Sequence, residues 1–563
     1  MKILKITIIS VFCLSYFCSV SQVSSSKYYI ELTDKNYNTY SINKPHEFLS
    51  DRAVQRRINQ NINIEERDLP VTQIYIDSLE NLGLNVLLKS KWFNAVTVET
   101  SDSLLMDTIT NLSFVNNSVK LLSVSEDDNE TDNNEEDETD DKEISGVEKK
   151  SMTIVRYNYY DYGDSENQVY FHSGQKLHDN GYRGKGMLIA ITDTGFDRVP
   201  SISSFDHLFA ENRIIKTGNF VYGGEDVYNE HTHGTLVLSA LAAIFPGYLI
   251  GTAPEAEYML FITEDTRSET MIEELYWVSA AELSDSMGAD LINVSLGYFK
   301  FDDSEFDYYY KDLNGKTAII SQAANIASQK GMIVVAAGGN SGRSKKNPHI
   351  GVPADADDII SVGAIRHNKE IATISSIGPT SDDRIKPDVV SIGIQTAVQH
   401  IKDSLSRGFG TSFAAPVICG LTACLWQKHP QKSNLEIIQA IKMSSSHYLN
   451  PDKYYGYGLP DFEIASHILE NAVLYPQDIR IRIFPNPFYR KFSITYPDYM
   501  QNEKITVSVT DVSGRTIFTK KYLGYQTQSN TIEIGKLKDI KTGFYVLSIL
   551  SNSGKFSQII IKR

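Results

Sequence analysis

Short, almost continuously apolar segments recur through the middle of the chain. Helix-like patterns such as AANIASQKG (323–331) lie between them. Strands that are apolar on both faces and alternate with helices are typical of a parallel sheet covered by helices. The pattern therefore predicts an α/β fold, with a mostly parallel doubly wound sheet, for residues 151–470. The predicted strands cover residues 187–192, 258–263, 291–296, 332–337 and 359–364.

The regions on either side of this alternation have other periodicities. Residues 27–124 combine alternating segments, KYYIEL and NAVTVET, with helical ones, SDRAVQRRINQ and YIDSLENLG. They predict a small α+β unit. From residue 477 onward, segments such as KITVSVTD and FYVLSIL alternate apolar and polar positions and are separated by Gly, Asn and Pro. This period of two predicts an antiparallel β-sandwich over residues 477–563.

The N-terminus has the pattern of an export signal. Lys2 and Lys5 precede an apolar stretch over residues 6–18, and small and polar residues follow. Because this stretch is too short to span a bilayer comfortably, we expect a cleaved signal peptide over residues 1–22 rather than an anchor. The bulky Phe17 before Cys18 disfavours a lipoprotein signal. We therefore expect export across the inner membrane, to the cell surface or the medium.

Negative charge is concentrated in one segment. The formal net charge is −16, and residues 126–143 hold twelve Asp and Glu against one Lys, a balance of −11 that leaves −5 for the rest. A segment this acidic, with almost no apolar side chains, predicts a disordered linker over residues 125–150. Calcium binding is the less favoured interpretation, because the acidic residues show no regular ligand spacing. The acidity also argues against nucleic acid as a partner.

The cysteines do not suggest a disulfide. Cys13 and Cys18 lie in the expected signal peptide, which leaves Cys419 and Cys424. Their spacing on a predicted helix places them on different faces, so we expect them to stay free.

Candidate chemical groups stand at the predicted strand ends and helix starts. Asp193 follows the first strand, and His233 opens an apolar helix, with His231 as a competitor two residues before it. Ser412 opens a second helix, whose Pro416 we place in the first turn, where a missing N–H is tolerated. Each group alone has an ordinary interpretation as a turn or a cap. The other candidates are Ser295, Leu296 and Gly297 after the third strand, and Gly338, Gly339 and Asn340 after the fourth.

Taken together, these groups cover the needs of one reaction. A serine hydroxyl becomes a nucleophile when an imidazole removes its proton, and a carboxylate fixes the tautomer of that imidazole. An Asn amide and a backbone N–H can then stabilise the oxyanion.

The motifs DTG, HGT and GTSFAAP, in this order, resemble the subtilisin family of serine peptidases, and GTAPEA (251–256) and YGYGLPD (455–461) also fit. The resemblance covers about residues 175–470. It implies that Asp193 orients the general base His233, which directly precedes Gly-Thr as His231 does not. It further implies that Ser412 is the nucleophile, that Asn340 is an oxyanion donor, and that residues 295–297 and 338–339 line the substrate cleft.

The flanking units resemble known companions of this family. FLSDRAVQRRINQ and SKWFNAVTVE are similar to a Bacteroidetes-type propeptide, which assists folding and inhibits its own peptidase. IFPNPF (483–488), VTDVSGR and KTGFYVLSI are similar to a type IX secretion sorting domain, which implies the secretion machinery as a partner. The resemblance implies no cofactor for catalysis. Structural calcium is common in such enzymes, and KFDDSEFD (300–307) is either a candidate loop for it or a solvated turn.

Two functions remain in contention. The first is a secreted serine endopeptidase that is made as a zymogen and acts on proteins or peptides. The second is a surface binding or adhesion protein that uses an inactive peptidase scaffold. The presence of all four catalytic side chains favours the enzyme. A lipase or esterase is excluded, because Ser412 is not in a G-x-S-x-G motif and the order of the groups differs.

Overall fold

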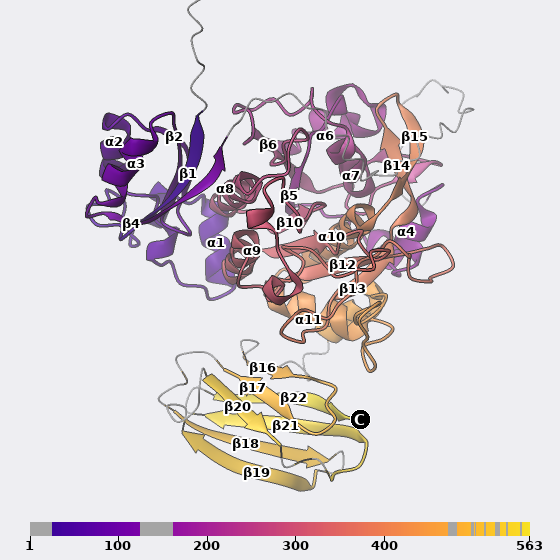
Figure 1. Ribbon diagram of the computed structural model, residues 1–563. Coiled ribbons are helices and arrows are strands. Elements are labelled where there is room, and N and C mark those ends of the chain that lie inside the picture. The colour runs from indigo at the N-terminus through magenta and orange to yellow at the C-terminus, as the bar shows by residue number, and fades with distance from the viewer. Residues whose placement is uncertain are drawn as a thin grey trace, which may run out of the picture.

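The computed structural model describes residues 25–123, 161–470 and, with short gaps, 481–563. Figure 1 shows the N-terminal unit in indigo against the side of a central body, with the C-terminal unit in yellow beneath that body. The expected signal peptide and acidic linker lie outside the described residues. Within these ranges, no helix is both long and apolar enough to cross a membrane.

A seven-stranded sheet forms the centre of the molecule, and all of its neighbouring strands run parallel. The prediction of a mostly parallel sheet is therefore confirmed, and each of the five predicted strands is present. Two edge strands, β6 (Ile214–Asn219) and β13 (Val389–Ile392), were not predicted, because β6 is largely polar and β13 has only four residues. In spatial order the strands are β13 (Val389–Ile392), β12 (Ile360–Ile365), β11 (Ile333–Ala337), β10 (Leu291–Val294), β5 (Leu188–Asp193), β9 (Glu257–Ile262) and β6 (Ile214–Asn219).

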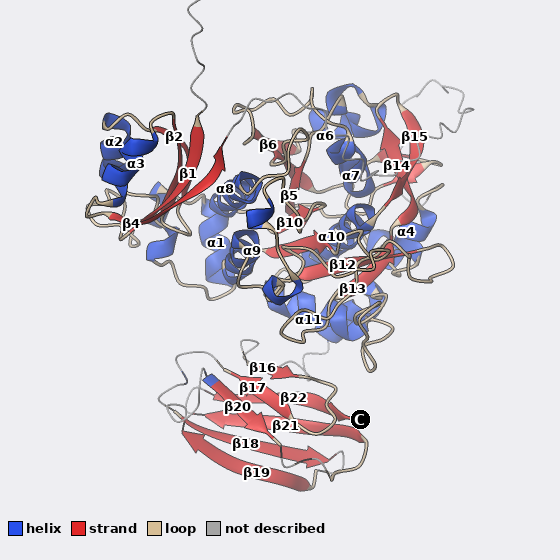
Figure 2. Ribbon diagram, viewed as in Figure 1, coloured by secondary structure: helices blue, strands red, loops and turns tan. Residues whose placement is uncertain are grey.

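Helices cover both faces of this sheet (Figure 2). One apolar core joins the sheet to α7 (His233–Ala242), α10 (Thr411–Lys428) and α11 (Asn434–Ser444). A second core joins its other face to α8 (Ile272–Met287) and α9 (Ile319–Gln329). The sheet is thus buried on both sides, as its uninterrupted apolar strands require.

Shorter elements complete the central body. The antiparallel hairpin of β14 (Ile394–His400) and β15 (Ser404–Phe409) directly precedes α10. The shorter elements are α4 (Glu166–Tyr170), α5 (Gln175–Asp179), η3 (Val199–Ser201), η4 (Ser203–Phe205), α6 (Asp206–Ala210), β7 (Ile244–Phe245), β8 (Leu249–Ile250), η5 (Ser304–Phe306), η6 (Tyr310–Asp312), β14 (Ile394–His400), β15 (Ser404–Phe409) and α12 (Phe462–Glu470).

The N-terminal unit is an α+β fold, as predicted. Its four strands form an antiparallel sheet in the order β2-β3-β1-β4. One face of this sheet packs on α8, where Tyr29 and Leu121 share an apolar cluster with Leu275 and Tyr276. Its elements are β1 (Ser26–Leu32), η1 (Pro45–Glu47), α1 (Asp51–Asn59), η2 (Glu66–Asp68), α2 (Gln73–Asn81), β2 (Asn85–Ser90), β3 (Ala95–Thr100), α3 (Ser103–Thr110) and β4 (Val115–Ser123).

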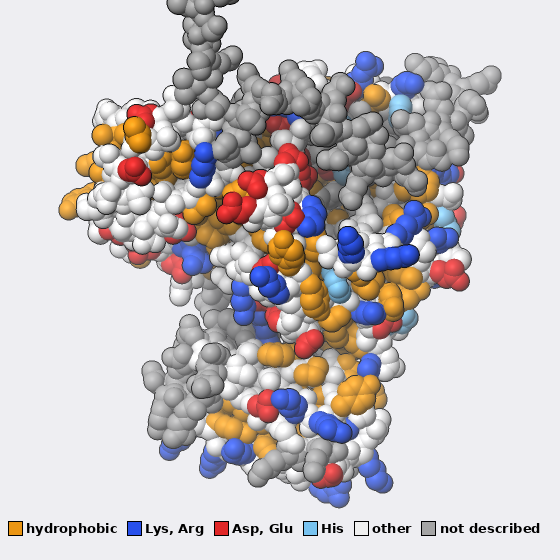
Figure 3. Space-filling view, viewed as in Figure 1, with side chains coloured by type: hydrophobic (Ala, Val, Ile, Leu, Met, Phe, Trp, Pro, Cys, Tyr) orange, Lys and Arg blue, Asp and Glu red, His pale blue; other side chains and the backbone are white. Residues whose placement is uncertain are grey.

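The C-terminal unit consists of two antiparallel sheets that share one apolar core. The order is β16-β17-β20 in one sheet and β19-β18-β21-β22 in the other, and Arg482 joins the unit to Asp357 and Asp358 of the central body. In the described part of the face that Figure 3 shows, Lys and Arg are interspersed with apolar and acidic side chains rather than gathered into one basic surface. The strands are β16 (Arg482–Phe484), β17 (Phe492–Thr495), β18 (Lys504–Asp511), β19 (Thr516–Leu523), β20 (Thr531–Ile534), β21 (Gly543–Ser551) and β22 (Gly554–Lys562).

Candidate active site

The candidate residues lie at the carboxyl-terminal edge of the central sheet. Asp193 is the last residue of β5, a central strand paired with β9 and β10, and is 2% exposed. The backbone N–H of Thr194 donates to its Oδ1 at 2.8 Å. Chain reversals at this edge bring residues from different connections together, which is why open α/β sheets carry their binding sites here.

His233, the first residue of α7, reaches the carboxylate of Asp193. The distance from His233 Nδ1 to Asp193 Oδ1 is 2.7 Å, and both side chains are largely buried. The close approach depends on Gly234, where a Cβ atom would lie 2.4 Å from the oxygen of Gly195 and 3.0 Å from the Cβ of Asp193. The Gly that follows the histidine is therefore a requirement of packing.

The start of α10 lies beside this pair. The ring of Phe413 is 5.4 Å from the imidazole of His233, and Ser412 precedes it as the second residue of the helix. Gly410 adopts φ = +137°, a conformation that favours glycine. A Cβ at Gly410 would lie 3.1 Å from Ser412 Oγ and 3.0 Å from Asn340 Nδ2, so these two polar atoms converge on one side of this glycine.

The amide of Asn340 is oriented by the residue before Ser412. The backbone N–H and the hydroxyl of Thr411 both donate to Asn340 Oδ1, at 2.9 and 3.1 Å. Because the oxygen is engaged by two donors, the orientation of the amide is fixed by Thr411. The arrangement provides a carboxylate, an imidazole, a hydroxyl and an amide donor in one place, which suits acyl transfer.

Three parts of the chain match sequence models of known domains. Residues 184–458 match the sequence model of the "Subtilase family", residues 27–138 match the "Peptidase S8 propeptide domain, Bacteroidota", and residues 482–563 match the "Secretion system C-terminal sorting domain". Residues 184–458 belong to the subtilase family.

Related subtilases are found among well-known bacterial proteases. The chain is 29% identical to subtilisin DY of Bacillus licheniformis over 52% of this chain and 94% of that protein. It is 28% identical to subtilisin E of Bacillus subtilis over 52% of this chain and 68% of that protein. The epidermin leader peptide processing serine protease of Staphylococcus aureus shares the fold, with a TM-score of 0.53 at 17% identity, over 79% of this chain and 98% of the other.

In the part of the chain that the structure describes, Asp193 pairs with His233 and not with His231, the other candidate histidine. His231 is exposed, and its Nδ1 accepts the backbone N–H of His233 at 3.3 Å. The hydroxyl of Thr194 lies 3.0 Å from the same nitrogen. His231 thus supports the start of α7, while His233 occupies the position beside the carboxylate.

The segment predicted to line the cleft divides into buried and open parts. The hydroxyl of Ser295 is buried and donates to the backbone oxygen of Ser412 at 2.8 Å. Gly297 is exposed and Leu296 is half-buried. The parallel pairing of β10 ends at Val294, so the backbone of residues 295–297 lies outside the sheet ladder and suits pairing with an extended peptide.

Pro416 lies deeper in α10 than predicted. Because the helix begins at Thr411, Pro416 is its sixth residue rather than part of the first turn. Its missing N–H would otherwise bond the carbonyl of Ser412, four residues earlier. That carbonyl accepts the hydroxyl of Ser295 instead, so the proline frees an oxygen that ties the nucleophile candidate to the cleft segment.

The two glycines after β11 are each needed for a different structural reason. Gly338 continues the backbone pairing, with its N–H donating to Val362 at 2.9 Å, and a Cβ there would lie 3.1 Å from the same oxygen. Gly339 adopts φ = +103° and donates its N–H to the hydroxyl of Thr411 at 3.0 Å. Both therefore hold Asn340 at the end of the strand.

The sequence motifs did not indicate one buried acidic residue near Asp193. Glu264 follows Thr263, whose backbone N–H donates to the backbone oxygen of Asp193 at 3.1 Å. Glu264 accepts the hydroxyl of Tyr298 at 2.5 Å, and burial raises its pKa to about 8. Its only sequence signal was a charged residue directly after an apolar strand.

No metal site emerges from the residues that the structure describes. Within them, no group of three or more His, Cys, Asp or Glu side chains is placed to hold a metal ion. In the acidic loop 300–307, Asp307 pairs with Lys300 and accepts the backbone N–H of Phe301 at 3.0 Å. This loop is therefore organised by a salt bridge. Cys419 and Cys424 are both free and buried in the core.

Proposed function

We propose that this subtilase is a secreted serine endopeptidase that is made as a zymogen and hydrolyses peptide bonds through an acyl-enzyme. The observation that supports it most is the 2.7 Å contact of His233 with Asp193, next to a helix start where Ser412 Oγ and Asn340 Nδ2 converge. The proposed catalytic residues are Asp193, His233, Ser412 and Asn340. Ser295, Leu296, Gly297, Gly338 and Gly339 are proposed to form the substrate cleft.

In the acylation step, Ser412 Oγ attacks the scissile carbonyl carbon and passes its proton to His233 Nε2. Asp193 holds the Nδ1 proton and stabilises the imidazolium. Asn340 Nδ2 and the backbone N–H of Ser412 donate to the oxyanion. The N–H of Ser412 is available because the first turn of a helix leaves its N–H groups without intrahelical partners.

The attack gives a tetrahedral intermediate that carries the oxyanion. Collapse of this intermediate breaks the peptide bond. His233 returns its proton to the leaving amine, and the acyl group stays on Ser412 as an ester. A water molecule then repeats the sequence, with His233 as its base, and releases the carboxylate product. Because the nucleophile, base and oxyanion donors are groups of the protein, we propose that catalysis requires no cofactor.

We propose a domain order that serves maturation and export. Residues 1–22 are removed as a signal peptide, and residues 27–124 act as an inhibitory propeptide. Residues 125–150 are the segment that is cut, and residues 151–470 are the peptidase domain. The sorting domain, residues 477–563, directs the protein through the secretion machinery to the cell surface or the medium.

Labelling with a fluorophosphonate probe tests the central claim. The processed protein should be labelled at Ser412, identified by peptide mass spectrometry, and labelling should disappear in Ser412→Ala and His233→Ala. A processed, folded protein that is not labelled would overturn the proposal in favour of an inactive scaffold with a binding role. The Ser412→Ala protein should also retain its linker if maturation is self-catalysed.

A further inference from the structure

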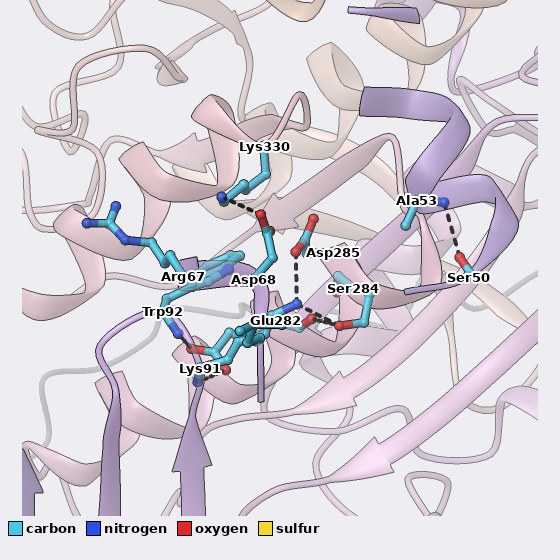
Figure 4. Close-up of polar contacts among 12 residues, drawn as sticks. Ser50, Ala53, Arg67, Asp68, Lys91, Trp92, Glu282, Ser284, Asp285 and Lys330 are labelled. Carbon is cyan, nitrogen blue, oxygen red and sulfur yellow. Dashed lines mark hydrogen bonds and ion pairs between the residues drawn. The ribbon is translucent and has the colours of Figure 1, made fainter. Parts of the chain in front are cut away.

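A cluster of buried charges joins the propeptide to the peptidase domain at a distance from the cleft (Figure 4). On the propeptide side, α1 contributes Arg52, Arg56 and Arg57. On the peptidase side, the cluster lies where α8 and α9 end. Ser50 caps α1, since its hydroxyl accepts the N–H of Ala53 at 3.1 Å, and its own N–H donates to the backbone oxygen of Ser286.

The guanidinium of Arg56 is inserted into a site made of carbonyl oxygens. Its Nε donates to the oxygen of Lys330 at 3.1 Å, its Nη1 to that of Ala289, and its Nη2 to that of Asp285 at 3.2 Å. Nη2 also contacts the Asp285 carboxylate at 2.5 Å. The last carbonyls of a helix lack intrahelical partners and carry partial negative charge, so two helix ends and a carboxylate together favour a cation.

Among the described residues, Asp285 has three cationic partners, all from the propeptide. Besides Arg56, it contacts Arg57 Nη2 at 2.9 Å and Lys91 Nζ at 2.9 Å. The carboxylate is fully buried. Burial alone would raise the pKa of Asp285, but the charges of Lys91, Arg57 and Arg56 lower it well below its usual range.

Lys330, at the end of α9, is a buried cation of the peptidase domain that pairs with acidic residues of the propeptide, as Asp285 pairs with its basic residues. Its ammonium lies 2.6 Å from Glu65 and 3.1 Å from Asp68, and Figure 4 shows Lys330 and Asp68 pointing toward one another. Asp68 also pairs with Arg57 at 2.7 Å. In the part of the chain that the structure describes, every ion pair of Asp285 and Lys330 is with a propeptide residue.

This contact lies at the opposite edge of the sheet from the candidate active site. Asp285 and Ala289 precede the start of β10 at Leu291, and Lys330 precedes the start of β11. Arg52 extends the contact along this edge, with bonds to the oxygens of Gly288 and Gly186, the latter just before β5. Asp193, by contrast, lies at the carboxyl end of its strand.

We propose that the ends of α8 and α9 form a docking site, separate from the substrate cleft, that recognises the propeptide as a basic helix and keeps it bound after the connecting linker is cut. This proposal depends on the proposed function only in assuming that the linker is cut during maturation. The occupant is the propeptide of the same chain, because its cations pair with the buried Asp285 and its Glu65 and Asp68 pair with Lys330. Withdrawal of the propeptide would leave Asp285 without its cations and Lys330 without its anions. Separation is therefore opposed even when nothing holds the propeptide in the cleft.

The test uses the full chain with Ser412→Ala, so that no outcome depends on catalysis. A recognition sequence for an exogenous protease is inserted within residues 125–150, the linker is cut, and propeptide release is followed by size-exclusion chromatography and by the dissociation rate after dilution. We expect the cut parent protein to remain a complex. Removing one partner of a buried, hydrogen-bonded charge pair accelerates dissociation strongly, so Asp285→Asn should dissociate at least about a hundredfold faster.

The matched control is Arg67→Met. Arg67 lies in the same propeptide segment but is exposed, and Figure 4 shows its side chain pointing away from the cluster. It should dissociate like the parent, whereas Arg56→Met should dissociate like Asp285→Asn. If Asp285→Asn fails to fold, Arg56→Met keeps the test open, since it leaves the peptidase domain unaltered. Dissociation of Arg56→Met and Arg67→Met at the same slow rate would overturn the proposal, whether or not Ser412 is a nucleophile.

Discussion

The side chain of Asn340 is held by Thr411, a residue 71 positions away that directly precedes Ser412. Two donors of Thr411 engage the amide oxygen, at 2.9 and 3.1 Å, which leaves the amide nitrogen as the proposed donor to an oxyanion. The candidate oxyanion donor is therefore oriented by the same helix start that carries the candidate nucleophile. Its orientation is fixed before substrate binds, which is what electrostatic stabilisation of a transition state requires.

Asn340→Leu is expected to lower kcat by about 10²–10³-fold with little change in KM, a range that was measured on subtilisin itself for the loss of one oxyanion donor. Folding should be almost unaffected, because Asn340 is exposed. Steady-state hydrolysis of a chromogenic peptide measures both constants. Asn347→Leu, in the loop that follows, serves as the control and should keep full activity. An unchanged kcat in Asn340→Leu would remove Asn340 from the mechanism.

Thr411→Val should lower kcat by about fivefold, in line with the loss of the hydroxyl's hydrogen bond to Asn340, worth roughly 1 kcal/mol. The valine retains the backbone N–H bond to Asn340 but loses the hydroxyl that also accepts the N–H of Gly339. Thr411→Ser keeps the hydroxyl and should recover most of the rate. Equal rates for the valine and serine variants would show that the hydroxyl does not position Asn340.

Local motifs were enough to propose the candidate site, and the fold prediction was confirmed in its main features. Asp193, His233 and Ser412 each stand at the end of an apolar run or the start of an apolar helix, and those patterns are visible in a few neighbouring residues. The edge strands β6 and β13 were missed because their short or polar sequences carry no such pattern.

Contacts between distant segments could not be predicted in this way. Arg56 and Asp285 are separated by 229 positions, and nothing in either local sequence indicates their pairing. The same applies to the contact of Thr411 with Asn340. Pro416 was placed wrongly because the first residue of the helix depends on the backbone at Gly410, which the apolar pattern does not specify.

The two neighbouring histidines should separate clearly by kinetics. His233→Ala removes the imidazole beside Asp193 and should lower kcat by about 10⁴–10⁶-fold, as for other catalytic-unit residues. His231→Ala removes only an acceptor for the N–H of His233 and the partner of Thr194, so we expect a loss below tenfold and about 1 kcal/mol of stability. Circular dichroism spectra of both variants, recorded beside the kinetics, show whether each variant is folded. The reverse order of losses would make His231 the base.

The buried Glu264 should make stability depend on pH. Its pKa is about 8 in the folded protein, raised by burial from the ordinary value of 4.5, so the folded state keeps a proton that the unfolded state loses above pH 4.5. The unfolded state is therefore favoured increasingly as pH rises from about 4.5 to 8, and this group adds no further change above that. Glu264→Gln has no proton to lose and should gain stability relative to the parent across the same window, by an amount on the order of 3–5 kcal/mol. Urea midpoints followed by tryptophan fluorescence at pH 5, 6.5 and 8, in full-length Ser412→Ala protein to prevent autolysis, measure the difference. Glu305→Gln, an exposed residue, is the control and should track the parent at every pH. If the midpoints of Glu264→Gln and the parent stay equally far apart from pH 5 to 8, Glu264 is already ionised in the folded protein.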